Sequence, residues 1–161
     1  MGDLTQNQKA ILSLYALIGA GSLMMVIPAS IILFAGIACA LVGFFACYFY
    51  RWKYKADEAM VFHAGYLIRT TWWSSLILLI GLIVFGSIIF GNGDMGAINQ
   101  MMQSAERGIV PNDADIIRMQ LEFVQTNRTL IYIAALALLP YPAFLLYRIV
   151  KGVKLLIKKE G

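Results

Sequence analysis

Charged residues are scarce in this chain, and their scarcity decides its class. Only 14% of the 161 residues are Asp, Glu, Lys or Arg, whereas soluble domains contain about 25%. Hydrophobic residues make up 60%, which is more apolar surface than a soluble fold of this size can bury. The stretch from Ala10 to Tyr50 contains no charged residue at all. These absences exclude an ordinary soluble domain and favour an all-α integral membrane protein.

Histidine and cysteine are also rare, which limits the possible chemistry. Cys39 and Cys47 would lie roughly 12 Å apart along one helix, too far for a disulfide. His63 is the only histidine, and no Cys near it completes a metal site. Asp57 and Glu58 are close enough in the sequence to pair with it. We expect a partly exposed histidine at the membrane surface, and neither a metal nor a cofactor.

Few prolines interrupt the apolar stretches, and their positions divide the chain. A single helix from 10 to 50 would be about 60 Å long, twice the hydrocarbon core of a bilayer. Pro28 lies near its middle, so we predict a tight hairpin between spans at about 10–27 and 31–50. Further spans are predicted at about 72–90 and 130–150, the last kinked by Pro140 and Pro142. The sequence therefore predicts one membrane domain, residues 1–161, with four transmembrane helices.

The segments outside these spans are expected to be helical too. A short interfacial helix is predicted over 56–68, within the loop 51–71. The loop 91–128 favours helices at 97–105 and 113–128, with Asn112 or Asp113 as the N-cap of the second. We expect this second helix to run directly into the fourth span. The tail 151–161 has the pattern of an interfacial helix.

The distribution of basic residues predicts the orientation. The loop 51–71 and the tail are rich in Lys and Arg, while the loop 91–128 has three Arg against five acidic residues. The positive-inside rule then places both basic segments and both termini in the cytoplasm, and 91–128 outside. This arrangement fits a multi-pass protein of a bacterial inner membrane.

Asp, Glu, Lys, Arg and His are missing from the interiors of the four spans. Proton relays and ion-coupled transporters usually require such residues, so an autonomous secondary transporter is disfavoured. The sequence also offers no nucleophile beside a base and an orienting group. We therefore expect that the protein is not an enzyme, and that it binds no nucleic acid because its basic residues flank apolar spans.

Three sets of residues are candidates for binding surfaces. Small residues recur every fourth position on the second span and favour close helix packing, either inside the protein or against another membrane subunit; these are Ala35, Cys39 and Gly43. Apolar residues outside the bilayer at roughly helical spacing predict a partner-binding face; these are Ile117, Leu121, Phe123 and Val124. Basic residues next to the membrane predict contact with lipid headgroups; these are Arg69, Lys151, Lys154 and Lys158.

Two short segments resemble a known family. The segments Phe62–Trp73 and Leu146–Leu156 resemble the "HF…IRTFW" segment and the "YRIVRGLLRL" ending of small bacterial multi-span membrane proteins of unknown function. Those proteins are distantly allied to the chloroplast inner-envelope translocon (Tic) channel subunits. The resemblance implies a membrane bundle and a pore or translocation role, and the long loop 91–128 departs from the family pattern.

Two functions therefore remain open from the sequence. The first is a structural or accessory subunit of a larger inner-membrane complex, with lipids and other integral subunits as partners. The second, implied by the resemblance, is a channel-like pore or translocation component. The sequence does not identify the complex, a transported substrate or the oligomeric state.

Overall fold

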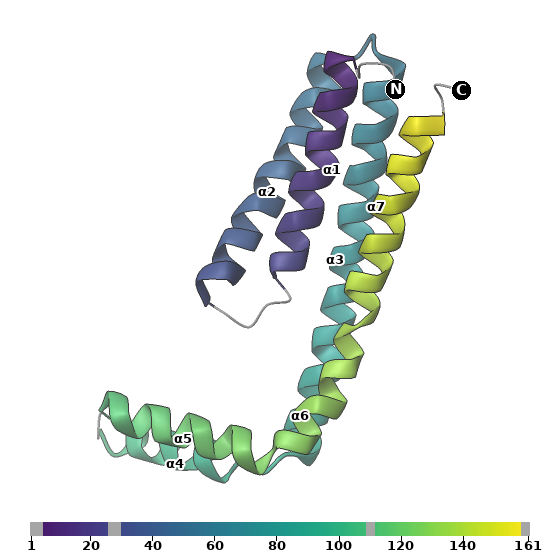
Figure 1. The fold of residues 1–161 in the computed structure, drawn as a ribbon. Helices are drawn as coiled ribbons and strands as arrows, with labels where there is room; N and C mark the ends of the chain where they lie inside the picture. The colour runs from purple at the N-terminus through teal and green to yellow at the C-terminus, as the bar shows by residue number, and fades with distance from the viewer. Residues whose placement is uncertain (1–4, 26–29, 109–111, 159–161) are drawn as a thin grey trace. The chain divides into compact units, whose positions relative to one another are not determined.

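The computed structural model describes residues 5–25, 30–108 and 112–158, and every element in these ranges is helical. The elements are α1 (Gln6–Met24), α2 (Ser30–Lys53), α3 (Glu58–Asn92), α4 (Gly96–Glu106), α5 (Asp113–Thr126), α6 (Arg128–Ala135), a short 3₁₀ helix η1 (Leu136–Leu138) and α7 (Pro140–Lys158). Figure 1 shows their order along the chain. The predicted all-α class is confirmed.

Three helical stretches are long and apolar enough to cross a membrane, namely Ile31–Lys53, Glu58–Asn92 and Arg128–Lys158. Large apolar side chains are exposed along them, among them Ile31, Phe34 and Phe90, as expected of helices surrounded by lipid rather than water. The chain is thus a membrane protein by the length and composition of its helices. α1, whose first turn is polar (Gln6 to Lys9), is not among the three found in the described residues, and the predicted count of four spans is not confirmed.

The separate interfacial helix predicted over 56–68 is wrong. α3 continues without a break from Glu58 to Asn92, so these residues form its first turns. Asp57 acts as the N-cap, since its Oδ1 accepts a hydrogen bond from the Met60 amide at 2.9 Å. The Asn7 side chain also donates to Asp57. Gly65 lies inside the helix, where its intrinsic cost is only about 1 kcal/mol.

The fourth predicted span also differs in detail. α5 ends at Thr126 and α6 begins at Arg128, so the predicted continuous helix from 113 into the span is wrong. The predicted interruption near Pro140 is confirmed, since the 3₁₀ residues Leu136–Leu138 precede it and Pro140 opens α7. Proline suits a first helical position because its missing amide has no intrahelical partner there. α7 then runs to Lys158, so the described part of the tail continues this helix instead of forming a separate one.

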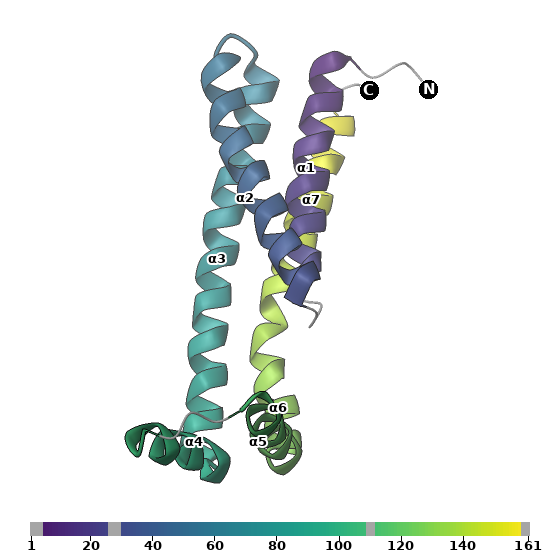
Figure 2. The same ribbon diagram turned by 90° about the vertical axis from the view of Figure 1, so that its left-hand side faces the viewer.

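The contacts divide the chain into two units, which are described separately. Unit 1 contains residues 1–78 and 140–161, and unit 2 contains residues 79–139. In unit 1, α1 packs against both α2 and α7, and Figure 2 shows α1 beside α7. In unit 2, α4 and α5 lie side by side (Figure 1).

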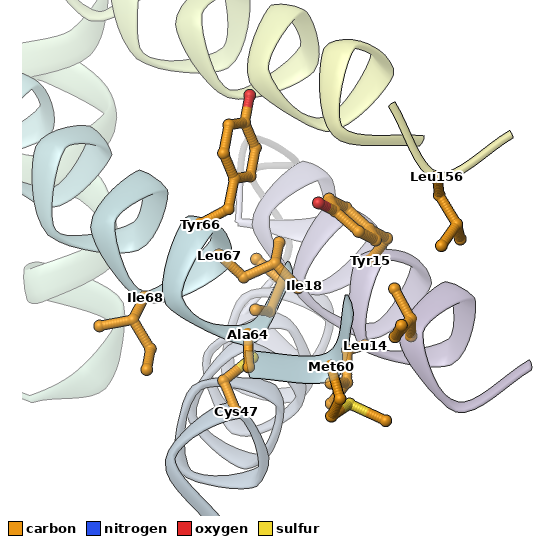
Figure 3. Packing of buried hydrophobic residues seen from close by; sticks show 11 residues of the cluster. Leu14, Tyr15, Ile18, Cys47, Met60, Ala64, Tyr66, Leu67, Ile68 and Leu156 are labelled. Atoms are coloured by element: carbon orange, nitrogen blue, oxygen red, sulfur yellow. The ribbon is translucent and has the colours of Figure 1, made fainter. Parts of the chain in front are cut away.

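The core of unit 1 draws on four helices (Figure 3). α1 contributes Leu14, Tyr15 and Ile18; α2 contributes Cys47; α3 contributes Met60, Ala64 and Leu67; and α7 contributes Leu156. All of these side chains are buried. Close packing around them fixes the α1–α2 pair and the first turns of α3 against α7 within this unit.

The α1–α2 pair approaches at the level of the backbone. A Cβ atom placed on Gly21 would lie 2.8 Å from the Gly36 carbonyl oxygen and 2.7 Å from the Ala40 amide nitrogen. A Cβ on Gly43 would lie 2.7 Å from Cγ1 of Ile18. These glycines therefore allow the two helices to meet closely, as small residues do in membrane bundles. The predicted hairpin turn at Pro28 lies outside the described residues.

Candidate functional site

The α4–α5 hairpin of unit 2 is built by local signals that the sequence predicted. Asn112 is the N-cap of α5, and its Oδ1 accepts from the Asp115 amide at 2.8 Å. Asp113 and Asp115 add negative charge in the first turn, where the helix dipole favours it. α4 ends near Gly108, whose φ of +68° suits a residue without a Cβ. Both predicted helices of the loop 91–128 are thus confirmed.

The apolar residues of α5 divide between two faces. Met119 is buried, and Ile116 and Phe123 are half-buried, as are Ile98 and Met101 of α4. By contrast, Ile117, Leu121 and Val124 are 56%, 56% and 50% exposed. They recur at spacings of four and three residues and so share one side of the helix. We call these three residues the outer stripe.

Phe123 was predicted to lie on the partner-binding face together with the outer stripe, but it follows Met119 by four residues and therefore shares its side of the helix. It is half-buried, whereas the three residues of the outer stripe are exposed. Polar and charged neighbours border the stripe, with Ala114, Arg118, Glu122 and Gln125 lining the same shallow hollow as Ile117 and Leu121. The exposed apolar strip is thus narrow and rimmed by polar groups.

Asn127 joins the hairpin to the end of α3 within unit 2. Its Oδ1 accepts from the Asp94 amide at 2.7 Å, and its Nδ2 donates to the carbonyl oxygens of Asp94 and Phe123 at 2.9 and 3.0 Å. The residue is only 4% exposed. Sequence reasoning missed this role, since a lone Asn before an apolar helix does not reveal a partner 33 positions away.

The predicted stripe of small residues on α2 serves internal packing. Gly43 meets Ile18 of α1, and Cys39 lies beside Gly21, 3.0 Å from the position of a Cβ there. Ala35 is half-exposed, and it is the neighbouring Gly36 that meets α1, since a Cβ there would lie 2.7 Å from the Gly21 carbonyl oxygen. Cys39 and Gly43 are therefore covered by this chain's own α1, and we do not propose them as a surface for another subunit.

His63 was predicted to be partly exposed, and this prediction is wrong. It is 1% exposed, and its Nδ1 lies 3.0 Å from the Tyr15 hydroxyl in a buried hydrogen bond. Tyr15 also fills the space beside Gly152, where a Cβ would lie 2.6 Å from the ring's Cζ atom. The contact links α1, α3 and α7 in the core of unit 1. Within the described residues, no group of three or more His, Cys, Asp or Glu side chains could hold a metal ion.

The lysines of the tail share one face of α7, as predicted. Lys151, Lys154 and Lys158 are all exposed and line one hollow with Tyr147 and Leu155. Lys151 also lies 5.8 Å from the centre of the Tyr147 ring. This face combines positive charge with an aromatic side chain, as expected at a membrane surface.

Arg69 lies on the surface of unit 1 beside a second arginine. It is exposed, and its Nε lies 3.4 Å from the Gly65 carbonyl oxygen. It lines a groove of about 460 Å³ together with Tyr66, Trp73, Phe144 and Arg148. The sequence identified Arg69 as a headgroup candidate, but not Arg148 as its neighbour, because 79 positions separate them in the chain.

The two segments that carry the family resemblance meet at this groove. The Tyr66 hydroxyl donates to the Arg148 carbonyl oxygen at 2.9 Å, and Arg148 Nε donates to Thr70 Oγ1 at 3.2 Å.

No family model, curated protein or solved structure matches the chain.

Proposed function

We propose that this protein is a structural or accessory subunit of a larger inner-membrane complex, which it contacts through the outer stripe of α5. The supporting observation is the division of α5 into a covered apolar face and an exposed one. In water, an exposed apolar strip of this kind is normally covered by a partner. The side of α5 that carries Ile116, Met119 and Phe123 is buried or half-buried, and α5 packs against α4. The outer stripe is therefore available for a contact with another protein.

The charge of α5 favours a protein partner over a lipid surface. The helix contains Asp113, Asp115 and Glu122 against a single Arg118. Helices that lie on anionic membranes are typically rich in Lys and Arg, and this one has the opposite balance. The complementary partner is a protein that presents an apolar ridge bordered by basic side chains.

The proposed topology has four spans, with α1 crossing the membrane as the partner of α2. Both termini then face the cytoplasm, and the α4–α5 hairpin lies outside. Reporter fusions before Met1 and after Gly161 should both report a cytoplasmic location, and a reporter inserted between 106 and 108 should report the outside. An external reporter at the N-terminus, with an internal one at the C-terminus, would show three spans instead of four.

The docking surface is tested by the double substitution Leu121→Asp with Val124→Asp, which places two charges on the stripe. Its matched control is Gln103→Asp with Gln120→Asp, which adds the same charge at exposed polar positions of the same hairpin. After purification in mild detergent, the stoichiometric partners found with the unaltered protein should be lost from the stripe variant and retained by the control. Recovery is normalised to membrane-inserted protein.

Two outcomes would contradict the proposal. Equal partner recovery by the stripe variant and the control would show that α5 is not the docking surface. Increased protease cleavage of the stripe variant's hairpin in pure lipid vesicles, compared with the control, would show that lipid covers the stripe.

A pore or translocation component is the second candidate, and it is favoured only by the resemblance of Phe62–Trp73 and Leu146–Leu156. A pore requires a polar path between spans. Conductance measured across planar bilayers containing the purified protein tests this candidate, and currents above those of a protein-free control would favour it over the accessory role.

A further inference from the structure

Arg148 of α7 is held rigidly by the first half of α3. Its guanidinium carbon lies 4.0 Å from the centre of the Tyr66 ring, which is a close cation–π contact. Its Nε donates to Thr70 Oγ1 at 3.2 Å, and the Thr70 hydroxyl in turn donates to the Tyr66 carbonyl oxygen at 2.8 Å. Thr70 is fully buried, and Tyr66 is nearly so. The arginine is thereby fixed before any ligand arrives.

The charge of this half-buried arginine is not balanced by a carboxylate in the described part of the chain. The single ion pair found there joins Arg118 to Asp115, in unit 2. Arg148 uses only its Nε in the hydrogen bonds described, which leaves four of the five N–H groups of a guanidinium. Removing a charge from water without pairing it is unfavourable, so an anion from outside the protein would stabilise this arrangement.

Arg69 supplies a second cation to the same groove. Among the described residues, its hydrogen bond also comes from Nε, in a long contact with the Gly65 carbonyl oxygen. Two guanidinium groups in one groove match the geometry of a phosphate, because each planar fork can donate two parallel hydrogen bonds to its oxygens. Lysine residues would provide the charge without this fork.

The remaining walls of the groove are apolar. Trp73 is 58% exposed, and Phe144 is half-buried; both lie on helices apolar enough to cross a membrane. Trp at such positions is typical of the level of lipid headgroups. A soluble anion would gain nothing from these side chains, whereas the glycerol and upper acyl chain of a lipid would pack against them.

We propose that the groove between Arg69 and Arg148 is a binding site for the phosphate of an anionic phospholipid. Arg148 is the fixed donor, Arg69 is the exposed donor that closes on the headgroup, and Trp73 with Phe144 contacts the apolar part of the lipid. Zwitterionic lipids are disfavoured, since their headgroup brings a third cation close to the two guanidiniums. This site lies in unit 1 and does not depend on the docking role of α5.

The test uses the full chain and the variant Arg69→Gln, because Arg69 is exposed and makes only one long contact inside the protein. The matched control is Lys55→Gln, which removes the same charge from an exposed position outside the groove. Native mass spectrometry after titration with phosphatidylglycerol, with phosphatidylcholine or with inorganic phosphate measures the bound molecules. Thermal unfolding in detergent micelles checks that both variants remain folded.

We expect the unaltered protein to retain one phosphatidylglycerol molecule in preference to phosphatidylcholine. Loss of one charged bidentate donor should weaken this binding about tenfold in Arg69→Gln, and Lys55→Gln should stay within about twofold of the unaltered protein. Equal phosphatidylglycerol binding by Arg69→Gln and the unaltered protein would overturn the site. Retention of inorganic phosphate without preference for phosphatidylglycerol would overturn the lipid as its source.

Discussion

Replacing Asn127 by Ala should loosen the junction between the end of α3 and the hairpin of unit 2. The substitution removes three hydrogen bonds, made at 2.7, 2.9 and 3.0 Å, and it leaves the Asp94 amide without its acceptor. A part-buried amide that loses its partner costs about 2 kcal/mol. The loss at the Phe123 carbonyl oxygen adds little, because the backbone amide of residue 127 still donates to it at 3.0 Å.

A change of about 2 kcal/mol corresponds to about a 30-fold change in an equilibrium constant. Amide hydrogen exchange measures this directly, since its rate follows the local opening equilibrium. With the protein in lipid nanodiscs, peptides covering 93–96 should exchange about 30-fold faster in Asn127→Ala. Peptides from α1 and α2, in unit 1, should be unchanged.

Asn112→Ala provides the control for this experiment. It removes the exposed N-cap of α5, which costs about 1 kcal/mol, but it leaves the bonds of Asn127 in place. Exchange should therefore rise only in the first turn of α5. If Asn127→Ala left the exchange of 93–96 within about twofold of the unaltered protein, the inferred role of Asn127 would be refuted.

Three further substitutions test unit 1. Gly152→Ala should destabilise the packing of α7 against Tyr15 of α1 by about 1–3 kcal/mol, because the added methyl group overpacks this contact. The expected result is a lower midpoint of thermal unfolding in detergent. An unchanged midpoint would mean that α1 and α7 can move apart at this point without cost. Tyr15→Phe removes the hydrogen bond to His63 and should cost about 1 kcal/mol in the same assay, whereas a neutral or stabilising effect would contradict the role of this bond. Replacing the tail lysines with Gln should weaken protection of the C-terminus from protease on anionic vesicles, at about 1 kcal/mol per residue, without changing membrane insertion; equal protection would count against lipid contact. The tail lysines are Lys151, Lys154 and Lys158.

The helix ends that could be predicted from the sequence are set by residues close to them in the chain. Asn112 and the acids after it mark the start of α5, and the Gly91–Asp94 segment marks the end of α3. Such signals depend only on neighbouring residues, so the sequence displays them directly. The apolar residues of α5 were also visible, but their division between a half-buried side with Phe123 and an exposed side with Leu121 depended on where α4 lies.

The long-range contacts could not be predicted. The charges of Asp57, Glu58 and Arg69 indicated a loop and an interfacial helix, yet a helix tolerates charged residues wherever they reach water, and α3 continues through them. His63 was expected near the surface because the sequence does not show that Tyr15, 48 positions earlier, lies against it. The groove of Arg69 and Arg148 likewise exists only after α3 and α7 meet.

The close approach of Gly21 and Gly36 has a consequence for how the protein is made. α1 begins with a polar turn and is not among the three helices suited to cross a membrane, and polar residues in a helix make its insertion on its own less favourable. In the four-span topology proposed above, α1 would enter the bilayer together with α2 as one helical hairpin, because the glycines pair the two helices and α2 is strongly apolar. Biogenesis of the N-terminal half should therefore depend on Gly36, and a bulky residue there should trap α1 outside the bilayer during synthesis while α2 still inserts.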